Sequence, residues 1–202
     1  MRAMRPTPGT SKAGTQTLLW YPLHYDSEEQ RAWSYQAGQR RVRLAPEFAY
    51  DTPVAQFGGA MFFDEINLFA GRMDRFRFEL KGRKLMYMPY NNYRMHLLRG
   101  DPAQLLGPHH FQPDKVRYEL RRVWVVEATP LPNARHMAKR KLFYLDEDSW
   151  IALAYEGWDQ SDRLFRLLLS NTMANYYTGG IIQGASVQAY DLARGQYAGL
   201  QL

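Results

Sequence analysis

The chain has 202 residues, no cysteine and a formal net charge of +6. The lack of cysteine excludes disulfides, thiolate metal sites, a cysteine nucleophile and lipidation at a cysteine within it. With 46% apolar and 14% aromatic residues the chain should fold, and no run approaches the ~18 consecutive apolar residues that a membrane-spanning helix needs. At this length we expect a flexible N-terminal segment over residues 1–16 and a single domain over residues 17–202.

Short runs rich in aromatic and β-branched residues alternate with Gly, Asp, Asn and Pro, a spacing that is typical of antiparallel strands joined by hairpins. Gly38 would supply the positive φ for the turn between the second and third runs. The pattern predicts a mainly β (α+β) fold with a strongly curved antiparallel sheet of about eight to ten strands. The expected strands cover residues 17–25, 31–36, 40–44, 75–80, 84–90, 117–129, 138–145, 150–156, 163–169, 185–192 and 196–202.

The run at residues 75–80 alternates strictly between charged and apolar residues, so Phe76, Phe78 and Leu80 share one face of a half-buried strand. Lys81-Gly82-Arg83 is expected to turn this strand back into its neighbour. A second turn is expected at Asp146-Glu147-Asp148, whose carboxylates should be exposed to solvent and bind no metal. Both turns would close hairpins.

One helix is expected at residues 61–71, because Phe62, Ile66 and Phe69 recur near one face and Gly71 suits a C-terminal cap. These three apolar side chains need burial, so the helix should lie against the concave side of the sheet. A further turn of helix is expected at residues 101–106.

No motif of nucleophilic, phosphoryl-transfer or dinucleotide chemistry occurs in the chain, which has no G-x-S-x-G elbow and no Walker loop. His109 and His110 are adjacent, and adjacent residues on a strand point to opposite faces, so a shared metal is not expected. The basic clusters lie inside expected strands, where alternation splits each between two faces and disfavours a nucleic-acid track. These clusters are Arg40-Arg41-Val42-Arg43, Arg121-Arg122 and Lys139-Arg140-Lys141. We therefore expect no cofactor, no metal and no nucleic-acid partner.

The unusual feature is a large apolar inventory of five Trp, nine Met, ten Phe and fourteen Tyr. Plain core packing accounts for most of these side chains. A single curved sheet, however, has a concave face wider than a few helices can cover, which leaves an apolar cavity. The candidate lining residues of that cavity are Phe62, Phe63, Phe76, Phe78 and Met88.

Three stretches of the chain carry a resemblance: residues 31–53 with GQRRVRLAP and AYDTP, residues 62–91, and residues 117–150 with YLDEDSW. They resemble one bacterial domain-of-unknown-function family of outer-membrane lipoprotein-sorting proteins, which is similar to the LolA and LolB lipoprotein carriers. The resemblance implies an incomplete antiparallel β-barrel closed by helices around an apolar cavity for acyl chains. It also implies a periplasmic location and a chain that is the C-terminal portion of a longer protein, and it implies no catalytic residue.

Two features depart from that family's pattern. The first residues lack the apolar region of about 7 to 15 residues that defines a secretory signal, and no cysteine can carry a LolB-type lipid. The expected function is a non-enzymatic carrier or chaperone for lipoprotein acyl chains, lipids or another hydrophobic ligand. The alternative is an interaction module that docks an envelope transporter or outer-membrane partner without a small ligand. An enzyme is a third hypothesis, because a fold never excludes a grafted site.

Overall fold

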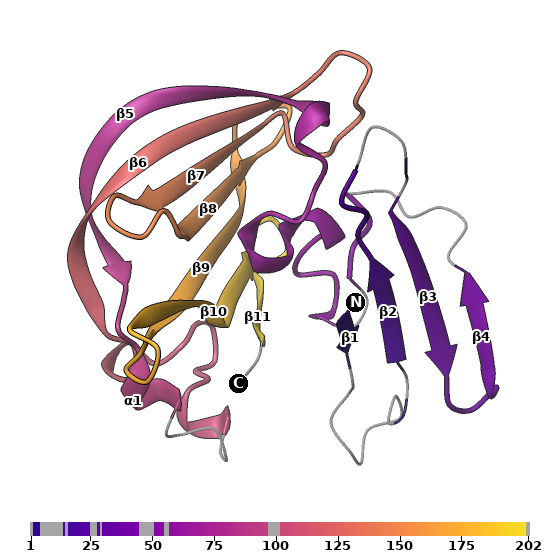
Figure 1. The fold of residues 1–202 in the computed structure, drawn as a ribbon, viewed down its shortest axis with the longest axis horizontal. Helices are drawn as coiled ribbons and strands as arrows, with labels where there is room; N and C mark the ends of the chain where they lie inside the picture. Colours follow the sequence, from indigo (N-terminus) through magenta and orange to yellow (C-terminus); the bar gives the residue numbers. More distant parts are fainter. Residues whose placement is uncertain are drawn as a thin grey trace. The chain divides into compact units, whose positions relative to one another are not determined.

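A computed structural model describes residues 2–4, 14, 16–24, 28, 30–44, 51–54, 57–96 and 102–200. The chain divides into two compact units, Met1–Thr52 and Pro53–Leu202. Each unit contains one antiparallel sheet (Figure 1). The expectation of a single domain over residues 17–202 stays a prediction.

The first unit is a four-stranded sheet in which each strand pairs with the next along the chain. Leu19 and Ala32 are cross-strand partners and are both buried, so one face of this sheet holds its apolar centre. The positive φ that we expected at Gly38 falls instead at Arg40, with φ 50°. The expected strand over residues 17–25 ends early, and its last residue lies outside the described residues. The strands are β1 (Arg2–Met4), β2 (Gln16–Trp20), β3 (Arg31–Gln36) and β4 (Arg41–Leu44).

The second unit is built on a seven-stranded antiparallel sheet with the order β11-β10-β9-β8-β7-β6-β5. Its two outermost strands are not joined to each other, so the sheet is an open, incomplete barrel as expected. In Figure 1, β5 and β6 describe a wide arc around the strands that follow them. The strands are β5 (Phe76–Pro89), β6 (Tyr118–Pro130), β7 (Arg140–Asp146), β8 (Ala152–Trp158), β9 (Leu164–Asn175), β10 (Gly180–Asp191) and β11 (Gln196–Leu200).

Every expected strand has a counterpart, but the eight to ten strands of one sheet are divided between two sheets in the described chain. β9 and β10 are longer than expected, because both strands continue through polar residues of the kind usually found in turns. Asn171 donates to Ser186 Oγ at 2.9 Å and accepts from Gln188 Nε2 at 2.9 Å. These buried amide and hydroxyl groups satisfy one another, so the sheet tolerates them.

The hairpin expected at Lys81-Gly82-Arg83 is wrong. β5 runs through this segment as one 14-residue strand, with a bulge between Leu80 and Gly82 in its pairing with β6. Gly82 takes φ 112°, a conformation that L side chains rarely adopt, and so absorbs the extra residue. The bulge changes which side chains share a face, because alternation restarts after it. Phe78 pairs opposite Ala128 and Met88 opposite Glu119, so these two β5 side chains lie on opposite faces of the sheet.

The helix expected at residues 61–71 is also wrong in type. The segment forms a short 3₁₀ element, η2 (Phe63–Leu68), broken at Asn67 and Leu68 with φ 54° and 73°. Phe62 and Ile66 are buried as expected, and η2 packs against β8, β9 and β10. In Figure 1, η2 lies on the open side of the arc that β5 and β6 describe. Remaining short elements are η3 (Met73–Arg75), α1 (Tyr93–His96), η4 (Pro102–Gln104) and η5 (Pro113–Lys115).

The turn after β7 joins β7 and β8 antiparallel, as expected, but Asp146 is fully buried rather than exposed. Its Oδ1 accepts from Arg121 Nε at 2.9 Å, and its Oδ2 accepts from Ser149 Oγ at 2.7 Å and from Tyr90 Oη at 3.2 Å. Burial acts to raise the pKa of Asp146, but Ser149 and Arg121 together hold it below its ordinary value. Asp146 therefore ties the turn to β6, and Asp148 is the exposed carboxylate of the run.

Candidate ligand-binding site

Four phenylalanines on the η2 side of the sheet form an aromatic cluster: Phe69, Phe76, Phe78 and Phe143. The ring of Phe69 lies 6.0 Å from that of Phe76, 6.1 Å from that of Phe78 and 5.5 Å from that of Phe143, each edge to face. The strand residues share this face because Phe78 lies opposite Ala128 and Phe143 opposite Val126 on β6. Edge-to-face rings at these separations are mutually favourable. Phe69 thus covers the part of the sheet next to η2.

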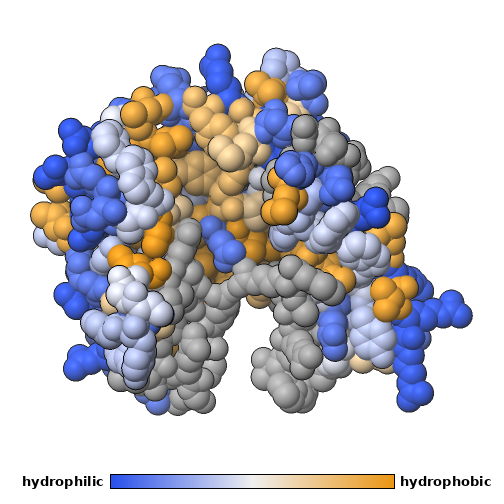
Figure 2. Space-filling view, viewed as in Figure 1, coloured by the Kyte–Doolittle hydropathy of each residue, from blue (hydrophilic) through white to orange (hydrophobic). Residues whose placement is uncertain are grey.

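Beyond the aromatic cluster the same face is not covered. Phe78 is 36% exposed and Leu80, the next residue on that face, is 59% exposed. Val126 and Leu145 continue the face and are half-buried. Figure 2 shows the unit hollowed between the arc of β5 and β6 and the η2 segment, with hydrophobic residues in the hollow. This apolar hollow is the candidate ligand-binding site.

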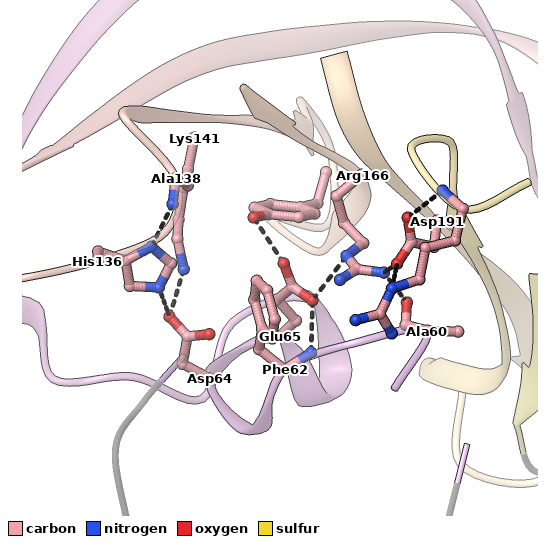
Figure 3. Close-up of polar contacts among 11 residues, drawn as sticks. Ala60, Phe62, Asp64, Glu65, His136, Ala138, Lys141, Arg166 and Asp191 are labelled. Carbon is pink, nitrogen blue, oxygen red and sulfur yellow. Dashed lines mark hydrogen bonds and ion pairs between the residues drawn. The ribbon is translucent and has the colours of Figure 1, made fainter. Parts of the chain in front are cut away.

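Charged side chains lie buried beneath η2, and two adjacent carboxylates of η2 reach different strands (Figure 3). Asp64 Oδ2 accepts from the Lys141 ammonium group of β7 and lies 3.0 Å from His136 Nε2. The other ring nitrogen of His136 lies 2.9 Å from the amide nitrogen of Ala138, which donates to it. Because Nδ1 accepts that bond, Nε2 carries the proton and donates to Asp64.

Glu65 makes the second half of the buried charge cluster. Its Oε1 accepts from Tyr155 Oη of β8 at 2.9 Å, and its Oε2 accepts from the Phe62 amide at 2.7 Å. Arg166 of β9 lies 3.4 Å from Glu65 Oε2 and 3.2 Å from Asp191 Oδ2, and donates to the Ala60 carbonyl. Two backbone groups and three strands are therefore joined through Glu65 and Arg166.

The pKa values of the two carboxyl groups shift in opposite directions. Burial acts to raise the pKa of Asp64, but Lys141 and His136 together bring it below its ordinary value. Burial raises the pKa of Glu65, and the neighbouring Asp64 adds to this, against the lowering effect of Arg166. Burial and the same carboxylates hold the pKa of Tyr155 well above its ordinary range. Asp64 is therefore the firmly ionised member of the pair.

The buried charge cluster fixes η2 to the sheet. Its charged members are at most 8% exposed, so none presents a reactive atom at the hollow. Buried ion pairs add little net stability, but separating the two partners leaves an uncompensated buried charge. An arrangement in which η2 moved away from the sheet would therefore be strongly disfavoured. The cluster thus determines where η2 and the adjoining Phe69 lie, and with them the border of the hollow.

The structure brings together some of the candidate lining residues and separates others. Phe76 and Phe78 belong to the aromatic cluster. Phe62 is buried, and the guanidinium carbon of Arg166 lies 4.7 Å from the centroid of the Phe62 ring. Phe63 is half-buried at the start of η2. Met88 is buried on the other face, in a core with Tyr90, Val123, Val125 and Tyr144. Their role in binding stays a prediction.

Sequence reasoning missed the buried charge cluster. Lys141 was counted in a basic run, although it shares its strand face with Phe143, a pattern that could have indicated a buried lysine. Phe143 itself was read only as part of a strand. Neither Asp64 nor Arg166 carried a signal, since their partners are distant in sequence.

A family model described as "Protein of unknown function (DUF1329)" matches residues 6–202. The chain belongs to the DUF1329 family. The uncharacterized protein PA3922 of Pseudomonas aeruginosa is 35% identical over 196 residues, which cover 97% of this DUF1329 chain and 43% of that protein. The chain therefore spans less than half the length of this relative.

Three solved structures are similar to the DUF1329 chain. A DUF1329 family protein from Desulfovibrio piger has a TM-score of 0.61 at 14% identity, over 93% of this chain and 62% of that one. A putative outer membrane lipoprotein-sorting protein domain from Vibrio parahaemolyticus has a TM-score of 0.60 at 14% identity, over 93% and 63%. The LolA superfamily protein NE2245 from Nitrosomonas europaea has a TM-score of 0.52 at 10% identity, over 94% and 64%. The chain therefore shares the fold of these three structures.

Proposed function

We propose that this DUF1329 chain is a non-enzymatic periplasmic carrier or chaperone that binds a hydrophobic ligand in the apolar hollow. The ligand class is a lipoprotein acyl chain, a lipid or another apolar compound, and an envelope transporter or outer-membrane protein would exchange it. The observation that carries the proposal is the uncovered apolar face beyond the aromatic cluster, where Phe78 and Leu80 are exposed. The likeness in fold to the LolA superfamily protein NE2245 supports the periplasmic location.

The energetics of an acyl ligand suit such a surface. Burying an acyl chain contributes roughly 0.8 kcal/mol per CH₂, so about ten methylenes offset much of the several kcal/mol lost in association. Micromolar affinity is reachable without a hydrogen bond. The phenyl rings of Phe78 and Phe143 supply apolar contact at the edge of η2, whereas the buried charges are already paired among themselves.

The test is displacement of an environment-sensitive fluorescent fatty acid from the full chain. Wild-type protein should bind the probe saturably, and Phe78→Asp should weaken binding about tenfold or more, because a carboxylate in the hollow must be desolvated. Leu192→Asp is the matched control, since Leu192 is 47% exposed in the turn after β10. Circular dichroism establishes that each variant folds.

Absence of saturable probe binding by the folded wild-type protein would overturn the carrier proposal. Equal loss in Phe78→Asp and Leu192→Asp would place binding outside the hollow. In either case the interaction module without a small ligand takes its place.

A further inference from the structure

Three large apolar side chains lie together on an exposed part of the β5–β6 pair, beyond the bulge. Tyr87 lies directly opposite Leu120, and Leu85 occupies the neighbouring position of the same face. Their exposed fractions are 72% for Tyr87, 55% for Leu120 and 65% for Leu85. Single exposed apolar residues are ordinary, but a contiguous group marks an interaction surface. We name these three residues the docking ribbon.

A tryptophan pair borders the docking ribbon. Trp124 lies on the same face of β6, and Trp150 stacks on it with ring centroids 6.2 Å apart and planes 11° apart. Trp150 is 67% exposed and its backbone is left-handed, with φ 60°. A bulky residue rarely adopts this conformation, so the turn holds an indole at the surface at a conformational cost.

The charges on this face are cationic. Arg83 and Arg122 lie among the apolar residues, and both contact the single carboxylate of Glu147, at 2.6 Å and 3.2 Å. The face carries no carboxylate of its own from Arg83 to Pro89 on β5 or from Tyr118 to Trp124 on β6. Two guanidinium groups that share one carboxylate leave a local positive charge.

The free edge of β5 is poorly suited to pairing with a strand of another chain. Arg77, Glu79, Lys81 and Lys84 are exposed along it, and the bulge at Gly82 interrupts its regular hydrogen-bonding groups. Charged side chains and bulges are the devices by which natural sheets prevent edge-to-edge association. A partner therefore meets the face of the docking ribbon rather than the strand edge.

We propose that the docking ribbon binds the surface of an anionic phospholipid bilayer. Leucine, tyrosine and tryptophan are the residues that settle at the boundary between headgroups and acyl chains, and arginines beside them contact lipid phosphates. None of the described helices is long and apolar enough to cross a membrane. The contact that we propose is peripheral and reversible. It does not depend on the carrier proposal, because its residues differ from those of the hollow.

The first experiment is co-sedimentation of the full chain with vesicles of phosphatidylethanolamine and phosphatidylglycerol, compared with vesicles of phosphatidylcholine alone. The anionic vesicles should bind the protein and release it at high salt. Arg122→Gln should weaken binding to them about fivefold, the usual effect of one basic residue near an anionic surface. Leu85→Asp with Tyr87→Asp should weaken it at least about tenfold. Leu192→Asp is the control and should bind like the wild type.

The orientation is tested with brominated lipids, which quench tryptophans in contact with the acyl region. Quenching should occur in the wild type and decrease in Trp150→Phe. The proposal is overturned if wild-type protein does not bind anionic vesicles, if Leu192→Asp loses as much binding as the double variant, or if bound protein shows no quenching of Trp150. Light scattering that finds a dimer dissociated by the double variant would assign the docking ribbon to a second copy of the chain and also overturn the proposal. Loss of probe binding without loss of vesicle binding in Phe78→Asp would separate the two sites.

Discussion

The region under η2 and the docking ribbon belong to the same face of one sheet, yet they invert the usual distribution of side chains. Under η2, Asp64 and Lys141 are fully buried, whereas Leu85 and Tyr87 on the docking ribbon are largely exposed to water. The difference lies in what covers the sheet. A short irregular segment carrying two carboxylates covers one end, and nothing in the described chain covers the other. Buried charge therefore specifies the position of a segment, and exposed apolar surface marks a place for another molecule.

The largest expected effect comes from separating the buried pair. Asp64→Asn leaves the Lys141 ammonium group without its counter-ion, and we expect a loss of about 3–5 kcal/mol in the free energy of unfolding. Urea unfolding at neutral pH measures it. Asp148→Asn is the control, because Asp148 is exposed, and should change stability by less than about 0.5 kcal/mol. Similar losses in the free energy of unfolding for the two variants would show that the buried charge cluster does not fix η2 to the sheet.

The adjacent carboxyl groups should give opposite pH dependence. The lowered pKa of Asp64 means that its contribution to stability is present above the unfolded-state pKa and is lost as pH falls through the lower folded-state value. The raised pKa of Glu65 means that stability is lost as pH rises from the unfolded-state value through the folded-state value.

Glu65→Gln should therefore remove a decline in stability toward higher pH, with an effect of about 1 kcal/mol at neutral pH, smaller than that of Asp64→Asn. Unfolding curves collected across acid and neutral pH measure this dependence. A Glu65→Gln protein whose stability declines toward neutral pH as steeply as that of the wild type would show that Glu65 is not the group responsible.

The smallest expected effect concerns Trp150. Trp150→Gly relieves a left-handed backbone at a cost of roughly 1–2 kcal/mol, and it removes a ring stack worth about 0.5–1.5 kcal/mol. The two terms oppose each other, so the melting temperature should change little, whereas vesicle binding should weaken. A large loss of stability would show that the exposed indole supports the fold rather than a surface.

Much of the fold follows from local pattern, because alternation and turn residues are readable in short windows. Phe76 and Phe78 were placed on one face for that reason, and the strand over residues 31–36 coincides with β3. Lys81-Gly82-Arg83 was misread because a glycine between charged residues suits a turn and a bulge equally well. Met88 was a candidate lining residue together with Phe78, but the bulge places the two side chains on opposite faces of the sheet.

The buried charge cluster could not be predicted in the same way. Asp64 and Lys141 are separated by 77 residues, and each alone resembles a solvated charge. Their burial depends on η2 crossing the sheet, a non-local arrangement that also replaces a regular helix by a broken 3₁₀ segment. Non-local ion pairs of this kind override the local helical spacing of Phe62, Ile66 and Phe69.

Native mass spectrometry of freshly purified protein tests the central claim, binding of a hydrophobic ligand in the apolar hollow, most directly. The wild-type chain should carry an adduct of lipid size, or acquire one on incubation with a fatty acid. Phe78→Asp should lose the adduct and Leu192→Asp should keep it. A wild-type protein that shows only its bare mass before and after incubation would contradict the account.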